Sequence, residues 1–203
     1  MMVKICGITR LEDARAAVDH GAAAIGFIFW PSSPRFIDPY RARKIARALP
    51  PFISTVGVFV NQPREYINGV ASLVPLSVVQ LHGDETPAFA ASLSRAVMKA
   101  VTRREQAGEW PEHVTLLVDV HDLAKRGGTG HVVDWKMAAS LARERRIVLA
   151  GGLTPENVAE AATAVQPWGL DVSSGVEVSP GIKDERRIAA FFAAIHRVRV
   201  STV

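Results

Sequence analysis

The chain has 203 residues, 48% of them hydrophobic, with 24 Lys and Arg against 20 Asp and Glu. This length and apolar content predict one domain, residues 1–203, and the single cysteine excludes an internal disulfide and a cysteine-based zinc cluster and fits a cytoplasmic protein. The basic residues are scattered and no apolar run is long enough to span a bilayer, so we expect neither a nucleic-acid partner nor a membrane.

The segment from residue 3 to residue 12, VKICGITRLE, combines a strand pattern with a helix start. Thr9 and Glu12 fit a capping box, in which each side chain bonds an exposed amide at a helix N-terminus. Because side chains alternate across a strand, Lys4 and Cys6 share one face, and a lysine at that distance favours the thiolate. The alternative, which this segment alone favours, is a small buried cysteine beside a satisfied interior lysine.

Short apolar runs recur along the chain, each followed by a capping or proline signal and an amphipathic segment. They predict eight strands, at residues 3–6, 24–29, 55–60, 78–81, 97–101, 115–118, 147–150 and 169–172. Residues that favour helix N-termini precede the expected helices, at Thr9, Asp38, Thr86, Asp134, Thr154 and Asp184, with a weaker signal at Gln62. The fifth connection, residues 103–112, is polar and contains a glycine, so we expect a short or irregular helix there.

Strands that alternate with helices pair in parallel through right-handed crossovers, and nearly continuous apolar strands indicate burial on both faces. Eight such units predict an α/β fold, a closed (β/α)₈ TIM barrel. A doubly wound open sheet is the alternative, since the sequence does not show closure. Active sites of such barrels lie at the carboxyl ends of the strands, where we expect Cys6, Arg35, Gln80, His82, Asp119, Gly151, Gly152, Asp171, Ser173, Ser174 and Gly175.

Two glycine-containing loops follow the last two expected strands. AGGLTPENV, residues 150–158, and DVSSGVE, residues 171–177, each place glycine directly after a strand. Glycine lets backbone amides approach a phosphate closely, and a helix N-terminus adds exposed N–H groups and a favourable dipole. Either loop alone could be an ordinary tight connection, but the pair occupies the two positions where barrels commonly bind phosphate.

These motifs resemble the phosphoribosylanthranilate isomerase family. The resemblance runs in order through nearly the whole chain, in VKICGIT, GFIFWPSSPRFI, VGVFVN, VQLHGDE, GGTG with DW, AGGLTPENV, and DVSSGVE with SPGIKD. It implies an Amadori rearrangement in tryptophan biosynthesis, which converts N-(5-phosphoribosyl)anthranilate to 1-(2-carboxyphenylamino)-1-deoxyribulose 5-phosphate. No metal-ligand spacing or dinucleotide fingerprint occurs in the sequence, so we expect no metal and no cofactor.

The resemblance assigns Cys6 as the general base at C2 of the sugar and Asp119 as the general acid at the ring oxygen. For these roles the thiol pKa must fall and the carboxyl pKa must rise from their ordinary values. Lys4 is our candidate cation beside the thiol. Asp122 is an alternative acid, and we prefer Asp119 because it directly follows the sixth strand.

The resemblance also implies that Arg35 pairs with the anthranilate carboxylate; a surface arginine is the alternative. Asp171 either orients a sugar hydroxyl, assists the acid, or forms a salt bridge to Lys4. His82, near Gln80, reads as a structural or supporting group. Gly128 belongs to a glycine-rich loop that could close over the substrate.

Other functions remain open at this stage. An indole-glycerol-phosphate synthase would use catalytic lysine and glutamate, and a pentose-phosphate epimerase would use carboxylates with a metal; the cysteine motif argues against both. A catalytically silent barrel that binds a phosphorylated metabolite is the alternative from another class. We expect a small phosphorylated aminosugar as the partner and either a monomer or a homodimer.

Overall fold

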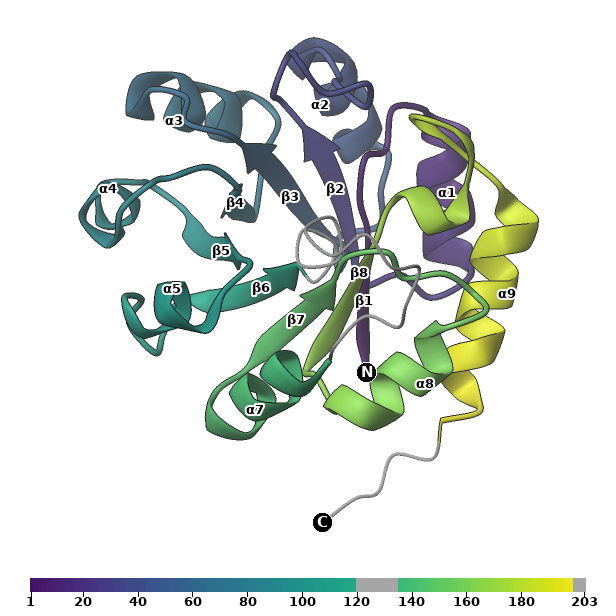
Figure 1. The fold of residues 1–203 in the computed structure, drawn as a ribbon. Helices are drawn as coiled ribbons and strands as arrows, with labels where there is room; N and C mark the ends of the chain where they lie inside the picture. The colour runs from purple at the N-terminus through teal and green to yellow at the C-terminus, as the bar shows by residue number, and fades with distance from the viewer. Residues whose placement is uncertain (120–134, 199–203) are drawn as a thin grey trace.

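The computed structural model describes residues 1–119 and 135–198. Eight parallel strands pair in the order β1 to β8, and β8 returns to β1 to close a barrel (Figure 1). The strands are β1 (Met2–Ile5), β2 (Ala24–Ile28), β3 (Ser54–Phe59), β4 (Val78–Leu81), β5 (Ala96–Val101), β6 (Thr115–Asp119), β7 (Ile147–Ala150) and β8 (Gly169–Val172). The predicted TIM barrel is confirmed, the open sheet is excluded, and each strand lies within one residue of its expected bounds.

Helices surround the barrel on its outside (Figure 1). They are α1 (Leu11–Asp19), α2 (Pro39–Arg47), α3 (Arg64–Leu73), α4 (Pro87–Ala91), α5 (Arg104–Gly108), α7 (Lys136–Glu144), α8 (Val158–Val165) and α9 (Glu185–His196). A 3₁₀ turn, η1 (Ser174–Val176), and a hairpin of β9 (Glu177–Ser179) and β10 (Ile182–Lys183) lie between β8 and α9. The helix in the fifth connection is short, as predicted, with five residues.

Three of the predicted helix caps are confirmed. The side chains of Asp38, Thr86 and Asp184 each accept hydrogen bonds from backbone N–H groups in the first turn of the following helix. Proline occupies the first position of α2 and α4, where its missing N–H costs nothing. Local side-chain chemistry therefore fixes where these helices begin.

The predicted cap at Thr9 is wrong, Thr154 accepts from the backbone N–H of Glu156 in a turn that precedes α8, and Asp134 lies outside the described residues. α1 begins after Arg10, and the Thr9 hydroxyl instead donates to the carbonyl of Gly181 at 2.5 Å. α8 begins at Val158, three residues later than Thr154 with Pro155 suggests, because a turn comes first. The Thr9 contact holds the loop after β1 against the β9–β10 hairpin. Rules for helix caps consider only neighbouring residues, so they do not predict a bond between segments so far apart in sequence.

Side chains alternate between two hydrophobic cores. Those that point out of the barrel pack against the helices in the larger core, which includes Ile5, Ile25 and Phe27. Those that point inward form a smaller core of Val56, Met98, Leu117, Val148 and Ala150. Because this alternation is fixed by the strand backbone, the inward positions near the carboxyl ends face the mouth of the barrel.

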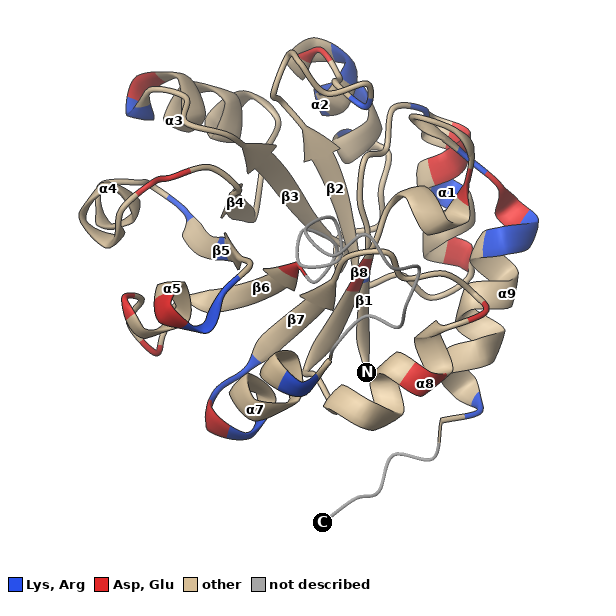
Figure 2. Ribbon diagram, in the orientation of Figure 1, with Lys and Arg blue, Asp and Glu red and all other residues tan. Residues whose placement is uncertain are grey.

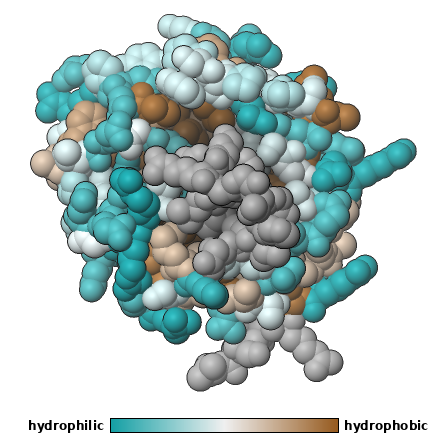
Figure 3. Space-filling view, viewed as in Figure 1, coloured by the Kyte–Doolittle hydropathy of each residue, from teal (hydrophilic) through white to brown (hydrophobic). Residues whose placement is uncertain are grey.

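Charged residues lie mostly on the helices and loops, with acidic residues also at the end of β6 and on β8 (Figure 2). In the space-filling view, hydrophilic residues occupy much of the periphery and hydrophobic residues gather mainly beside the grey segment (Figure 3). In the described part of the chain, the basic residues lie on several separate helices and loops (Figure 2), in keeping with their scattered sequence positions. Among the described residues, no helix has the length and apolar character needed to cross a bilayer.

Candidate active site

The two residues expected to transfer protons lie at the carboxyl ends of their strands. Cys6 directly follows β1, and Asp119 is the last residue of β6. In the closed sheet β7 and β8 separate these strands, so both residues border the same mouth from strands three positions apart. This is the end of the barrel at which active sites of the fold are built.

The thiol of Cys6 lies inside the barrel, over a glycine of the neighbouring strand. A methyl group placed on Gly26 would lie 3.0 Å from Cys6 Sγ and 2.9 Å from Lys4 Cε. The flanking residues Ile25 and Phe27 belong to the outer core, so the open side of Gly26 faces the interior. Cys6 is buried, with 5% of its surface exposed, and shares this space with Lys4.

Burial raises the pKa of the Cys6 thiol, because a low-dielectric environment disfavours the thiolate. The ammonium of Lys4 opposes this rise through charge and hydrogen bonding, the carboxylate of Asp171 adds to it, and Lys183 opposes it. Lys4 therefore lowers the pKa of the thiol, as expected. The net pKa of Cys6 is nevertheless raised, where the sequence led us to expect a fall. Desolvation outweighs the cations that face the sulfur.

Lys4 and Asp171 form a buried salt bridge. Lys4 Nζ donates to Asp171 Oδ1 at 2.9 Å, and the two residues are direct partners in the register of β1 and β8. Burial lowers the pKa of Lys4, but the carboxylate of Asp171 and the thiol of Cys6 outweigh it, and the net pKa is raised. The salt bridge that the sequence left open is thus present, and it keeps a positive charge beside the thiol.

Asp119 lies beside His82, with 3.7 Å between Asp119 Oδ2 and His82 Nε2. The side-chain amide of Gln80 lies 3.1 Å from His82 Nδ1, and which of the two groups donates depends on the tautomer of the ring. His82 is therefore a direct neighbour of the expected acid, with Gln80 holding its ring in place.

The loop after β7 has the backbone that its glycines predict. Gly151 and Gly152 have φ values of +89° and +65°, in the left-handed region that disfavours other residues. The Asn157 side chain donates to the carbonyl of Gly152 at 2.9 Å and accepts from the backbone N–H of Thr154 at 2.8 Å. These bonds fix the loop between the strand and α8.

The loop after β8 packs directly against the loop after β7. A methyl group on Gly175 would lie 1.8 Å from the carbonyl oxygen of Leu153, so only glycine fits there. The hydroxyl of Ser173 donates to the carbonyl of Cys6 at 3.1 Å, and Ser174 begins η1. The two expected phosphate loops are thus adjacent, and the second one is bonded to the residue that carries the thiol.

Arg35 reaches from the loop after β2 to a carboxylate of this same chain. Its Nη2 donates to Glu177 Oε2 at 2.7 Å, and its Nε lies 2.9 Å from Glu177 Oε1. Hydrogen bonds from Arg35 and Lys183 hold the pKa of Glu177 below its ordinary value, although burial raises it. Arg35 therefore belongs to an ion-pair network with Glu177 and Lys183. The alternative, a surface arginine without such partners, is wrong.

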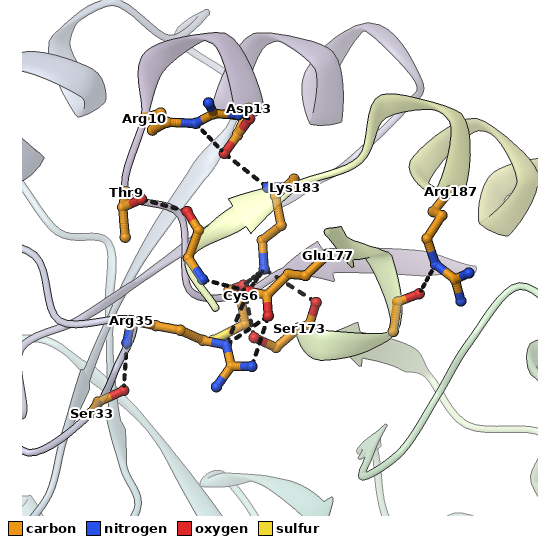
Figure 4. Close-up of polar contacts among 12 residues, drawn as sticks. Cys6, Thr9, Arg10, Asp13, Ser33, Arg35, Ser173, Glu177, Lys183 and Arg187 are labelled. Carbon is orange, nitrogen blue, oxygen red and sulfur yellow. Dashed lines mark hydrogen bonds and ion pairs between the residues drawn. The ribbon is translucent and has the colours of Figure 1, made fainter. Parts of the chain in front are cut away.

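The sequence analysis missed the centre of this network, Lys183 on β10. Its side chain has no exposed surface, and its Nζ donates to the carbonyl of Cys6 at 2.6 Å and to Glu177 Oε1 at 2.8 Å (Figure 4). Its backbone N–H donates to Asp13 of α1 at 3.1 Å. Both Lys183 and Glu177 lie in motifs that the sequence analysis had already singled out. Glu177 ends DVSSGVE, and Lys183 follows the glycine of SPGIKD by two positions.

A cavity of about 520 Å³ lies at the opposite end of the barrel. Its lining includes the first residues of several strands, among them Met2, Ala24 and Val78. Of the described residues named for the site, Lys4 alone also lines this cavity, and the others lie toward the mouth. Among residues 1–119 and 135–198, no group of His, Cys, Asp and Glu is arranged to hold a metal ion, and Gly128 and Asp122 lie outside these residues.

A thiol and a carboxyl group at the mouth, with two glycine loops beside them, are the arrangement expected of an enzyme of the (β/α)₈-barrel class. Within that class, the family model for N-(5'phosphoribosyl)anthranilate (PRA) isomerase matches residues 3–194. The chain therefore belongs to the phosphoribosylanthranilate isomerase family, as its motifs indicate.

Individual relatives agree with this assignment over their whole length. The N-(5'-phosphoribosyl)anthranilate isomerase of Pelobacter propionicus is 48% identical over 201 residues, which cover 97% of this chain and 96% of the relative. The crystal structure of phosphoribosyl anthranilate isomerase from Thermotoga maritima superposes with a TM-score of 0.90 at 43% identity, covering 97% of this chain and 98% of that one. A phosphoribosyl anthranilate isomerase solved in complex with reduced 1-(O-carboxyphenylamino)-1-deoxyribulose 5-phosphate has a TM-score of 0.87 at 42% identity, with the same coverage.

Proposed function

We propose that this protein converts N-(5-phosphoribosyl)anthranilate to 1-(2-carboxyphenylamino)-1-deoxyribulose 5-phosphate, with Cys6 as the general base and Asp119 as the general acid. The observation that carries this proposal is the position of a thiol and a carboxyl group at the carboxyl ends of β1 and β6. A relative that binds a reduced form of the expected product supports it. We place the activity in the cytoplasm, where a lone thiol stays reduced.

The proposed reaction needs two proton transfers. Asp119 donates a proton to the ring oxygen as the furanose opens, which leaves a protonated Schiff base between the sugar and the anthranilate nitrogen. The thiolate of Cys6 then removes the proton at C2, and the resulting enolamine becomes the ketone by a proton shift. Groups that act in this way contribute roughly 10²- to 10⁴-fold each to a rate.

The base must be a thiolate although burial raises the pKa of Cys6. The cation of Lys4 opposes that rise before substrate arrives, and the protonated Schiff base adds a positive charge next to C2 after the ring opens. On the other side of the mouth, His82 Nε2 lies 3.7 Å from Asp119 Oδ2. We propose that this contact orients the carboxyl group toward the ring oxygen.

The same mouth offers groups for both charged ends of the substrate. We assign the phosphate to backbone amides of the two adjacent loops, at Gly151, Gly152, Ser173, Ser174 and Gly175. We assign the anthranilate carboxylate to Arg35, whose guanidinium has five N–H donors and so retains donors beyond those that Glu177 takes. Asp171, held by Lys4, is placed to accept from a sugar hydroxyl.

Turnover of phosphoribosylanthranilate, followed as loss of its fluorescence, tests the activity. The wild type should turn over, and Asp119→Asn should lower kcat about 10²-fold or more, since an amide cannot donate the proton of a carboxylic acid. A protein that only binds a phosphorylated metabolite would show no turnover in either form. A variant with wild-type kcat would remove Asp119 from the mechanism.

We further propose that the protein forms a homodimer through the amino-terminal end of its barrel. Phe52, just before β3, is 96% exposed, and Trp168 and Met2 at the same end are each almost half exposed. Such a concentration of apolar surface favours a protein interface. A Thermotoga maritima relative, 39% identical with a TM-score of 0.82 over 97% of this chain and 99% of its own, is described as a monomer generated from a dimeric enzyme.

Light scattering tests the oligomeric state directly. The wild type should have the mass of two chains, and Phe52→Asp should shift the population toward one chain, because a charge replaces an exposed aromatic side chain without loss of core packing. A wild-type mass of one chain at micromolar concentration would contradict the dimer.

A further inference from the structure

Lys183 is an interior cation whose three N–H donors all have acceptors near the active site. Its Nζ donates to the carbonyls of Cys6, at 2.6 Å, and Ser173, at 3.2 Å, and to Glu177 Oε1, at 2.8 Å (Figure 4). One ammonium group therefore joins the residue that carries the thiol to the first residue of the loop after β8. These contacts cross 177 and 10 residues of sequence, and they add to the hydrogen bonds that Cys6 already makes with Ser173 and with the backbone of Val172.

Glu177 extends this contact to a third loop. It accepts from Lys183, from Arg35 of the loop after β2, and from the backbone N–H of Gly181 at 3.2 Å. Its side chain is 4% exposed, so it exchanges few of these bonds for water. The charged trio of Lys183, Glu177 and Arg35 therefore links the thiol, the proposed phosphate loop and the proposed carboxylate-binding residue, with a net charge of one positive unit.

Burying a lysine in this way brings little stability, because desolvation offsets most of the attraction between paired charges. A second buried pair in the same barrel offers a direct comparison. Lys99 and Glu85 are 3.0 Å apart with side chains 6% and 3% exposed, close to the values for Lys183 and Glu177. Lys99 also donates to a backbone carbonyl, that of Gly83, but it has no contact with Cys6.

We propose that Lys183 is a positioning residue for the reaction, which fixes the backbone of Cys6 and supplies positive charge behind its thiol. This inference rests on the proposed role of Cys6 as the base. By the same bonds Lys183 holds Glu177, which in turn holds Arg35, so the base and the carboxylate-binding residue keep a fixed relation to one another.

Several charged groups face the thiol from the elements around it. Lys4 lies beside it on β1, Asp171 on β8, and Lys183 on β10, while Arg35 and Glu177 lie next to Lys183. Of these, Lys4 already shares its charge with Asp171 in a salt bridge. Removing the charge of Lys183 therefore leaves the thiolate with less stabilisation, and the pKa of Cys6 should rise.

The experiment is a direct titration of the thiol, which needs no turnover. Because the chain has one cysteine, the resonance of a ¹³C-labelled Cys6 Cβ reports this thiol alone as pH is raised. In Lys183→Met, the midpoint should rise by about one pH unit, from the loss of one charge at short range in a protein interior. Lys183→Arg should restore most of the shift, and the matched control Lys99→Met should leave the midpoint unchanged.

Kinetics on the same variants provide the second readout. The pH at which kcat rises should move with the thiol midpoint in Lys183→Met and not in Lys99→Met, although both variants lose stability. If Lys183→Met does not fold, Lys183→Gln removes the charge and keeps a side-chain N–H donor, and its thiol midpoint should rise in the same way. A thiol midpoint equal to that of the wild type overturns the proposal, whereas a shifted midpoint in a protein without turnover contradicts only the proposed function.

Discussion

Gly26 gives the sharpest structural prediction, because the side chains of Lys4 and Cys6 occupy the space beside it. A methyl group on Gly26 would lie 2.9 Å from Lys4 Cε, 3.0 Å from Cys6 Sγ and 3.1 Å from Cys6 Cα. Ordinary contacts of this kind begin at about 3.5 Å, so the neighbours must move by about 0.5 Å. Since one contact is with the backbone of Cys6, a side-chain rotation alone does not relieve it.

A displacement of about 1 Å in a reacting group costs on the order of 10²-fold in rate. For about half that displacement, we expect Gly26→Ala to lower kcat roughly tenfold and to destabilise the fold by about 1–3 kcal/mol from overpacking. The assay is the fluorescence-based turnover of phosphoribosylanthranilate, paired with thermal unfolding. The KM should change less than kcat, because the proposed phosphate loops do not contact Gly26.

The matched control is the same substitution at Gly69, in the middle of α3. A methyl group there meets no atom within 4 Å, so Gly69→Ala should keep the wild-type kcat and stabilise the helix by up to about 1 kcal/mol. If Gly26→Ala is folded and its kcat lies within about threefold of the wild type, the thiol does not act from the position described.

Three further predictions concern the network around Arg35 and the loop after β8. Arg35→Lys keeps the charge but loses the planar fork, so KM should rise about tenfold with little change in kcat in steady-state kinetics. Despite burial, Arg35 and Lys183 hold the pKa of Glu177 below its ordinary value, so its stabilising contribution is present above about pH 4.3 and lost as pH falls through the folded-state value. The difference in unfolding midpoint between wild type and Glu177→Gln should therefore shrink in acid; a constant difference would contradict this. Gly175→Ala places a methyl group 1.8 Å from the carbonyl of Leu153 and should cost about 3 kcal/mol or more in denaturant unfolding, and a stable variant would mean that the two loops separate easily.

Much of the fold is visible in the sequence because its determinants are local. Parallel strands buried on both faces are short apolar runs, and caps such as Asp38 and Asp184 act on amides two or three residues away. The expected order of strands and the positions of Cys6 and Asp119 at the mouth follow from those signals. Closure of the sheet, in contrast, depends on the pairing of β1 with β8, which no local pattern contains.

The parts of the site that the sequence analysis missed depend on contacts between distant segments. Lys183 reaches Cys6 across 177 residues, and Glu177 reaches Arg35 across 142. Thr9 and Glu12 have the spacing of a capping box, yet the hydroxyl of Thr9 donates to the carbonyl of Gly181. The β9–β10 hairpin places that carbonyl within hydrogen-bond distance of Thr9. The net rise in the pKa of Cys6 was missed for a similar reason, since the extent of burial follows from the whole barrel and not from Lys4 alone.

The most direct test of the account separates binding from proton transfer at Cys6. Both kcat and the affinity for reduced 1-(O-carboxyphenylamino)-1-deoxyribulose 5-phosphate would be measured for wild type and Cys6→Ser, because an alcohol is a far weaker base than a thiol at neutral pH. We predict that kcat falls about 10²-fold or more while the affinity stays within about threefold. A Cys6→Ser variant that keeps the wild-type kcat would contradict the claim that this thiol removes the substrate proton.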